Sequence, residues 1–315
     1  MKAHDLLSGL GLPARDLSEL PDSEKCFPDG AQYRVEIPSV EGPRVLEAVI
    51  EEAQRRGVQL HRVSQGSGIM LLTDGEILEM CAMAREAGLE LSLFVGPRAS
   101  WETGATAISG AGKVLGAQHR GQDQLAYALE DVLRGVDLGL RGVLVADAGL
   151  LWVIRDLKER GDLPQDLVVK VSVQLAAANA AAVKAMESLG AGTYNVPTDL
   201  SLAQLAAIRA ATSLPLDVYV EVPDDFGGFV RHYEIPDLVR VASPVVVKFG
   251  LRNAPNIYPS GTHLEATAVA LGKERVRRAE IGLAMLERYY PEAEATEKGT
   301  TFPGIPVETT VEEKA

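Results

Sequence analysis

Eight short apolar segments recur along this chain of 315 residues, and a helical pattern separates most neighbouring pairs. Such an alternation places successive strands parallel to one another, joined by crossover helices. The segments cover residues 33–38, 58–64, 89–95, 142–147, 167–175, 191–197, 215–222 and 244–250. Eight units within about 250 residues match the size and the strand count of a TIM (β/α)8 barrel. The sequence therefore predicts an α/β fold of this type.

An open doubly wound sheet is the competing architecture, and the first strand argues against it. No GxGxxG turn follows that strand, although dinucleotide-binding sheets of this kind carry one. The segment "SGAGK" (109–113) suggests a phosphate loop, but Val114 follows the lysine and no glycine occupies the required earlier position. Three predicted helices end at Gly57, Gly88 and Gly190, where helix C-caps are expected.

The segments outside the strand–helix repeat predict three regions. Residues 1–32 are expected to form an N-terminal helical cap, residues 33–290 the barrel, and residues 291–315 a flexible acidic tail. Two stretches, 96–121 and 250–263, are longer than a minimal barrel needs. Both should leave the carboxyl ends of the strands, which is the face where barrel active sites lie.

Composition excludes several classes of partner. The formal net charge of −13 argues against nucleic acid and against an anionic membrane surface. No run of eighteen apolar residues predicts a membrane span, and the N-terminus does not resemble a signal peptide. Cys26 and Cys81 are the only cysteines, and they form no CxxC pair. We therefore expect a cytoplasmic protein with two free thiols.

Side chains on a strand alternate between its two faces, so each predicted strand has one face inside the barrel. In the fifth strand the aliphatic residues suit the helix-facing side, which turns Lys170, Ser172 and Gln174 inward. The second strand is ambiguous, since either His61 and Gln65 or Arg62 and Ser64 face inward. The same rule predicts these further inward residues: Arg34, Glu36, Ser92, Phe94, Asp147, Asn195, Tyr219, Glu221 and Lys248.

The predicted interior is thus unusually polar. Burying an unpaired charge costs several kcal/mol, so these groups must be paired, hydrated or bound to a ligand. For Arg34 and Lys170, deep in their strands, we expect salt bridges. Residues at the carboxyl ends of strands are better placed for function. The predicted mouth consists of Glu36, Asp147, Gln174, Asn195, Glu221 and Lys248.

Two kinds of chemistry suit that mouth. Glu36, Asp147 and Glu221, with a loop histidine, could hold a divalent metal ion. The same carboxylates could instead act as general acid and base. Lys248 could form a Schiff base if buried and neutral, but we favour a lysine that pairs with an acid or binds a substrate anion.

Loop residues around the mouth supply further candidates. Arginines on the long loops could clamp an anion through two parallel hydrogen bonds, and one of several histidines could take part. The arginines are Arg98, Arg120 and Arg252, and the histidines are His119, His232 and His263. For substrate binding we select Arg62, Gln174, Asn195, Arg252 and His232.

The stretch "VSVQLAAANAAAVKAMESLGAGTYNVPTDLSLAQLAAI" (171–208) resembles the central part of the collagenase-like peptidases of family U32, which are barrel proteins. The matching residues are Ser172, Gln174, Asn179, Gly190, Leu200 and Ser201, and "VLVADAGLLWVI" (143–154) adds Asp147 and Gly149. The family's defining segment after the seventh strand runs Glu-x-Phe, then His-Gly, then cysteines. Here Asp217 and Tyr219 stand for its first two positions, and the rest is missing.

That departure limits what the resemblance implies. Some family members are implied to be iron–sulfur hydroxylation proteins, whose cluster needs cysteines that this chain lacks. We therefore expect no iron–sulfur cluster, and peptidase activity does not carry over.

The sequence predicts a barrel enzyme that acts on a small polar or anionic substrate by acid–base or metal-assisted chemistry, as a lyase, isomerase or hydrolase. A divergent U32-like hydrolase that depends on Glu221 is one alternative. A non-catalytic binding barrel with an apolar rim of Trp101, Ile257 and Tyr258 is another. We also expect a homo-oligomer, with residues 279–290 as an amphipathic helix that serves either self-association or the barrel's own shell.

Overall fold

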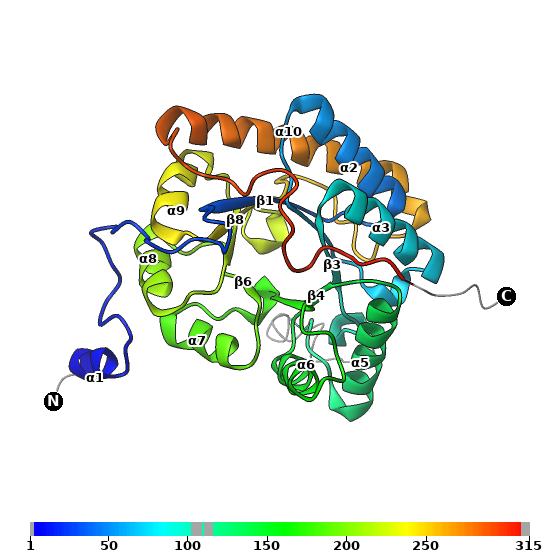
Figure 1. The fold of residues 1–315 in the computed structure, drawn as a ribbon, viewed down its shortest axis with the longest axis horizontal. Coiled ribbons are helices and arrows are strands. Elements are labelled where there is room, and N and C mark those ends of the chain that lie inside the picture. The colour runs from blue at the N-terminus through cyan, green and yellow to red at the C-terminus, as the bar shows by residue number, and fades with distance from the viewer. Residues whose placement is uncertain (1–2, 102–108, 110–115, 310–315) are drawn as a thin grey trace.

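Eight parallel strands close into a barrel in the order β1 to β8, which confirms the predicted TIM-barrel fold. The computed structural model describes residues 3–101, 109 and 116–309 (Figure 1). Each predicted segment contains one of the strands, except that β2 extends one residue beyond its segment. They are β1 (Tyr33–Pro38), β2 (Arg62–Gln65), β3 (Glu90–Phe94), β4 (Gly142–Val145), β5 (Val168–Val171), β6 (Thr193–Asn195), β7 (Leu216–Glu221) and β8 (Val245–Phe249).

The helices surround the barrel as a shell (Figure 1). Those described are α1 (Ala3–Gly9), α2 (Pro43–Arg56), α3 (Asp74–Ala87), α5 (Gly121–Asp137), α6 (Ala148–Arg160), α7 (Ala180–Ser188), α8 (Leu202–Ala211), α9 (Ile235–Ala242) and α10 (Glu265–Tyr289). Local sequence sets their ends. Gly57 and Gly88 close α2 and α3 in the left-handed conformation that glycine adopts without strain. Ser201 begins α8 through a capping box with Gln204.

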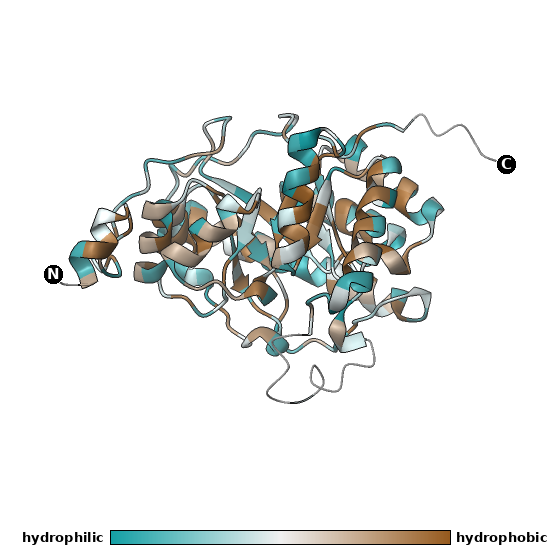
Figure 2. Cartoon of the chain, turned by 90° about the horizontal axis from the view of Figure 1, so that it is seen from below, coloured by the Kyte–Doolittle hydropathy of each residue, from teal (hydrophilic) through white to brown (hydrophobic). Residues whose placement is uncertain are grey.

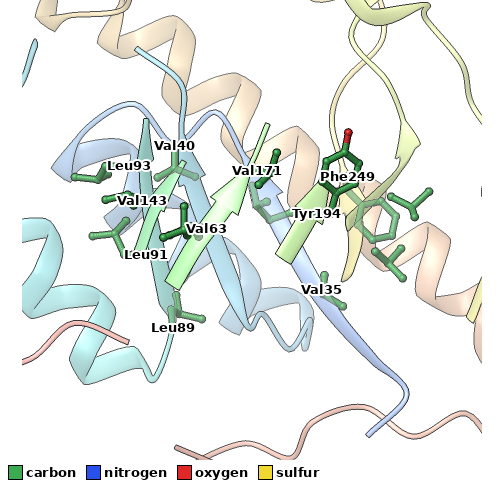
Figure 3. Packing of buried hydrophobic residues seen from close by; sticks show 14 of the residues in the cluster. Val35, Val40, Val63, Leu89, Leu91, Leu93, Val143, Val171, Tyr194 and Phe249 are labelled. Carbon is green, nitrogen blue, oxygen red and sulfur yellow. The ribbon is translucent and has the colours of Figure 1, made fainter. Parts of the chain in front are cut away.

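The hydrophobic core lies between the strands and the helices. Val35, Val63 and Val143 share this layer with Tyr194 and Phe249, all buried (Figure 3). Val169 and Val171 also belong to it, so the helix-facing assignment for β5 is confirmed over the strand itself. Beyond Val171 the strand ends and a short 3-10 turn covers residues 173–175, so Val173 and Leu175 are only partly buried.

The N-terminal segment differs from the expected helical cap. Its only helix, α1, buries no residue and lies at one end of the molecule, apart from the barrel (Figure 2). The following residues run extended along the shell, where the Leu17 and Ser23 amides bond to carbonyls of Ala203 and Arg240. Phe27 and Ala31, 3% and 4% exposed, form a small core cluster with Val246 at the barrel's base. The apolar residues of α1 are too few and too exposed to close a barrel.

The C-terminal segment also differs from the expected flexible tail, because residues 290–309 cross the N-terminal face of the barrel (Figure 1). Thr296 is 1% exposed and accepts a 2.9 Å hydrogen bond from Arg34 Nε. Phe302 stacks on the Arg34 guanidinium at 3.9 Å, opposite Phe27 at 4.1 Å. The composition of this segment, rich in Glu, Thr and Lys, gives no sign that Thr296 and Phe302 fix it to the barrel. Residues 310–315 lie outside the described residues.

Helix α10 completes the shell by packing against α2 and α9. Within residues 279–290 it buries Ala279, Gly282 and Leu286, so this amphipathic stripe serves the barrel's own shell. Exposed apolar residues remain at Ile281 and Tyr289, and the expected homo-oligomer stays a prediction. No helix among the described residues is long and apolar enough to cross a membrane.

Candidate active site at the barrel mouth

Glu36 is the centre of a buried network of charges inside the barrel. It is fully buried and contacts four inward side chains. Lys170 Nζ donates to its Oε2, Ser64 Oγ donates to Oε1 at 2.6 Å, and Lys248 Nζ lies 3.1 Å from Oε1. Arg62 Nη1 approaches Oε2 at 3.3 Å. The lysines and Arg62 hold the pKa of the Glu36 carboxyl well below its usual range, against the opposing effect of burial.

Arg62 and Lys170 extend the network to two further carboxylates. Arg62 donates to Asp217 at 2.8 Å and pairs with Glu90, also at 2.8 Å. Lys170 lies 3.2 Å from the other oxygen of Asp217. Burial lowers the pKa of Lys170 to about 8, although Asp217 and Glu36 oppose this shift. Lys170 therefore forms the predicted salt bridges, and Arg34 pairs with Asp29 at 3.6 Å. Arg62 with Ser64 is the inward pair of β2.

A cavity of about 730 Å³ opens above this network, at the carboxyl ends of the strands. Its floor carries Lys248 from β8, Tyr219 from β7, Asn195 from β6 and Gln174 after β5. Lys248 Nζ sits 4.4 Å from the centre of the Tyr219 ring. Three of the predicted site residues, Gln174, Asn195 and Lys248, thus meet in one cavity, whereas Glu36 and Arg62 lie in the layer beneath.

The floor contains polar groups without partners in the fold. Asn195 is 2% exposed, and its Oδ1 has no hydrogen bond to any described residue. The side chains of Tyr219 and Gln174 line the same cavity. Buried polar groups are normally paired, so this floor is suited to bind a polar ligand. Burial raises the pKa of the Tyr219 phenol, which keeps it a hydrogen-bond donor.

Glu221 does not line this cavity, unlike the inward position predicted for it. Its Oε1 accepts from the backbone amide of Arg252 at 3.1 Å, and its Oε2 lies 3.4 Å from His232 Nε2 and 3.6 Å from Arg278. The pairing of β7 with β8 shifts register between Tyr219 and Glu221. Strict alternation fails past such an irregularity, which explains the error. These donors lower the pKa of Glu221 although burial raises it.

Asp147 also lies away from the cavity. It caps α6 by accepting from the Leu150 amide at 2.9 Å, and it accepts from the His119 amide at 3.2 Å. The His119 ring is buried 4.0 Å from Asp147, and burial lowers its pKa. A short acidic residue after a strand is a common helix N-cap, and this role accounts for Asp147.

The remaining loop candidates do not converge on the floor. Arg252 is 57% exposed at its side chain and lies 3.7 Å from Asp224. His232 packs edge-on against Phe249, and His263 and Arg120 are exposed. Residues 102–108 and 110–115 of the predicted long loop, with most of "SGAGK", lie outside the described residues.

The predicted metal-binding carboxylates do not meet. Glu36 is surrounded by cations, Asp147 caps a helix and Glu221 faces His232. No cluster of three His, Cys, Asp or Glu among the residues described could hold a metal ion. The expected metal site from these three carboxylates is therefore not formed.

Two residues that sequence reasoning left aside also line the cavity. Arg98 is one of the three candidate loop arginines, of which the sequence favours Arg252, and Arg275 of α10 is not among the predicted site residues. Arg275 falls on the same stripe as Gly272, Val276 and Ala279, and its place among these small apolar residues is the signal that could have marked it as inward.

Comparison with known proteins agrees with the central part of this architecture. The family model of Peptidase family U32 matches residues 117–222. This part of the chain is U32-like. It runs from the segment before α5 to the end of β7, and it includes Gln174, Asn195 and Tyr219 of the floor. Lys248, Glu36, Arg98 and Arg275 lie outside the U32-like part, as does the segment where the family carries its His-Gly pair and cysteines.

Solved structures with the same fold are distant. A U32 peptidase is 19% identical with a TM-score of 0.43, over 75% of this chain and 97% of that one. A truncated 3-deoxy-D-arabino-heptulosonate 7-phosphate synthase from Thermotoga maritima is 14% identical with a TM-score of 0.42, over 85% and 93%. These similarities carry no information on the chemistry of this chain. No curated protein matches it.

Proposed function

We propose that this protein is a barrel enzyme that binds a small polar substrate in the mouth cavity and catalyses proton transfer, with Lys248 contacting the reacting group. One observation carries the proposal. The Lys248 ammonium is fixed by Glu36 at 3.1 Å on a cavity floor where the buried Asn195 Oδ1 has no hydrogen-bond partner among the described residues.

The network beneath the floor supports a fixed positive charge at that position. Glu36 receives Lys170, Arg62 and Ser64 on its other lone pairs, so its carboxylate cannot rotate freely. Preorganised charges of this kind stabilise charge that develops in a transition state without reorganising. Lys248 would therefore donate to a substrate oxygen that becomes negative, as in proton abstraction next to a carbonyl group.

A proton acceptor is needed on the opposite side of the substrate. Asp224 and Asp225 are the described carboxylates that line the cavity. Asp224 is engaged by the Asn253 amide and by Arg252, whereas Asp225 receives only a 3.4 Å hydrogen bond from Asn256. Asp225 is therefore the better candidate for the base. It would accept the substrate proton while Lys248 donates to the substrate oxygen.

The two rival functions are less well supported. A hydrolase that depends on Glu221 would need that carboxylate in the cavity, but Glu221 faces His232 and Arg278 instead. A binding barrel was expected to expose an apolar rim. Ile257 is only 2% exposed and Trp101 stacks on the Arg98 guanidinium, so of the three predicted rim residues Tyr258 is the one that is exposed, at 37%.

Solvent exchange tests the proposal directly. Small hydroxy acids, keto acids and their phosphate esters would be incubated with the protein in D2O, and NMR would follow loss of carbon-bound protons or formation of product. The matched variants are Lys248→Met and Lys184→Met, since the Lys184 side chain is 53% exposed. A positioned acid or base typically contributes 10²–10⁴-fold to rate.

We expect exchange with at least one compound, reduced at least 100-fold in Lys248→Met and unchanged in Lys184→Met. Exchange that persists in Lys248→Met would refute the assigned role. Saturable binding of a compound without exchange or product would refute catalysis and favour the binding barrel.

A further inference from the structure

Two buried arginines line the wall of the mouth cavity, and neither forms an ion pair with a described carboxylate. Arg98 is 7% exposed and Arg275 is 3% exposed. Arg62, an arginine of the barrel interior, has by contrast three carboxylate partners. Burial of a charge costs several kcal/mol unless an opposite charge compensates it. The wall therefore carries positive charge that the fold leaves uncompensated.

Two aromatic rings, rather than a carboxylate, hold the Arg98 side chain in place. Its guanidinium lies 3.7 Å from the centre of the Phe94 ring and 4.2 Å from that of Trp101. Nη2 donates to the carbonyl of Gly66, and the buried Nε has no hydrogen-bond partner. Burial lowers the pKa of Arg98 to about 10, so the side chain still carries its charge at neutral pH. Stacking on the two rings fixes the plane of the guanidinium group and leaves N–H donors free to bind a ligand.

Arg275 reaches the same wall from α10. Its Nη1 makes one long hydrogen bond, 3.5 Å to the carbonyl of Ser39, and its buried Nε has no partner. Burial lowers its pKa as well. A guanidinium has five N–H donors, and this one uses a single donor within the described structure.

One small group of residues connects the two arginines. The Tyr258 hydroxyl hydrogen-bonds Ser39 Oγ next to Arg275, and the Tyr258 ring packs on Gly66 next to Arg98. A Cβ atom at Gly66 would come within 2.5 Å of that ring, so the close approach requires glycine. Ser39, Gly66 and Tyr258 line the same cavity as both arginines. The wall is thus one continuous surface.

Glu41 lies behind this surface but does not neutralise it. Its oxygens accept from the Gly66 amide at 2.7 Å and from the Ser67 amide and hydroxyl at 3.0 and 2.5 Å. It influences both arginines electrostatically without forming an ion pair with either. Burial raises the pKa of Glu41. Its bonds organise the Gly66 turn that receives Arg98.

We propose that Arg98 and Arg275 bind an oxyanion of the substrate, a phosphate or carboxylate group. The inference rests on the proposed function for the identity of the ligand as substrate, and it narrows the substrate class to small compounds that carry an anionic group besides the reacting oxygen. Guanidinium groups suit both anions because their forked donors match two oxygens.

Trp101 provides a direct reporter of this site. The chain has two tryptophans, and the second, Trp152, is 46% exposed on α6. In a Trp152→Phe background, Trp101 emission would be titrated with inorganic phosphate and, separately, with acetate. Sodium chloride at the same ionic strength corrects for screening, which weakens any unspecific attraction.

We expect a saturable change of Trp101 emission with at least one of the two anions, and the stronger ligand identifies the group. Arg98→Lys and Arg275→Met should each weaken its affinity at least tenfold. Arg44→Met, whose side chain is 69% exposed, should leave it within twofold. Circular dichroism would confirm that the variants are folded.

Two results would overturn the inference. One is saturation that survives both substitutions, and the other is an emission change that sodium chloride reproduces. Neither of these two results depends on catalytic turnover of a substrate. Loss of exchange chemistry in Lys248→Met tests the proposed function alone, so the two proposals fail separately.

Discussion

Lys248 Nζ lies 3.1 Å from Glu36 Oε1, while Lys170 donates to the other oxygen of the same carboxylate. Glu36 thus joins a lysine of the cavity floor to a lysine that is fully buried. Beneath them, Arg62 connects Glu36 with Asp217 and Glu90. The three cations and three carboxylates of this network balance, which makes a charged barrel interior stable. Each member depends on the others.

Lys170→Met should therefore destabilise the protein strongly. The substitution leaves Glu36 and Asp217 buried with one cation fewer, and breaking a buried pair in this way typically costs about 3–5 kcal/mol. Urea unfolding followed by circular dichroism measures the change. Lys184→Met is the control, because Lys184 is 53% exposed and lies 3.9 Å from Glu187, and it should change the unfolding free energy by less than about 0.5 kcal/mol. Equal effects of the two variants would contradict the charge network.

His61 should make stability depend on pH in the acidic range. Its Nδ1 accepts from the Val35 amide at 3.0 Å, and its Nε2 lies 2.8 Å from the Thr296 carbonyl, to which it donates. Burial lowers the pKa of His61 to about 4, from 6.5. The unfolded chain therefore binds more protons between these values. Stability from the neutral ring is complete above pH 6.5 and is lost as pH falls towards 4.

Urea unfolding at pH 7 and pH 4.5 would measure this contribution by comparing wild type with His61→Gln. The wild type should lose about 2–3 kcal/mol more than the variant between the two pH values, at about 1.4 kcal/mol per pKa unit. His263→Gln, at an exposed position, should follow the wild type. The same pH dependence in wild type and His61→Gln would rule out this role.

The period of the strands sufficed to predict the barrel and much of its interior. The alternation of side chains correctly placed Glu36, Lys170 and Lys248 inside the barrel. Along a regularly paired strand, every second side chain points to the same face. It could not choose between the two polar faces of β2, since both contained polar residues. Only the carboxylates opposite, such as Asp217, select Arg62 for the interior.

Other features depend on contacts between distant segments. The register shift after Tyr219 turns Glu221 out of the cavity, and no local pattern announces it. Arg98 and Arg275 meet the cavity from a loop and from the last helix. Likewise, the C-terminal segment is held by single anchors such as Phe302. The intrinsic preference of a residue for helix or strand reflects its local sequence. The positions of Glu221, Arg98, Arg275 and Phe302 depend instead on packing between distant segments.

Glu221→Gln tests whether the mouth cavity functions independently of the neighbouring cluster of Glu221, His232 and Arg278. Glu221 lies near His232 and Arg278, so the amide would weaken these contacts. The anion affinity reported by Trp101 should remain within twofold of wild type, because Glu221 does not line the cavity. Exchange chemistry should change by less than threefold for the same reason. Loss of activity comparable to that of Lys248→Met would contradict this separation and support a hydrolase that uses Glu221.

Asn195→Ala should remove function without a cost in stability. Asn195 is buried, and its side-chain Oδ1 makes no hydrogen bond with a described residue; an unpaired buried polar group costs about 1–3 kcal/mol. The alanine variant should thus unfold at the same or a higher urea concentration. The kcat/KM for a substrate found by deuterium exchange should fall at least tenfold, because the amide is free to bind that substrate.

Thr193→Val on the same strand is the matched control. The Thr193 hydroxyl donates to Asp217 at 2.6 Å, so its removal should destabilise the protein by about 1–3 kcal/mol. Because Thr193 lies in the layer below the cavity, the KM of this variant should stay near that of wild type. Asn195→Ala should then impair substrate turnover but not stability, whereas Thr193→Val should lower stability but not substrate binding. A clear loss of stability in Asn195→Ala would show that Asn195 supports the fold, and the floor would no longer be a site with free polar groups.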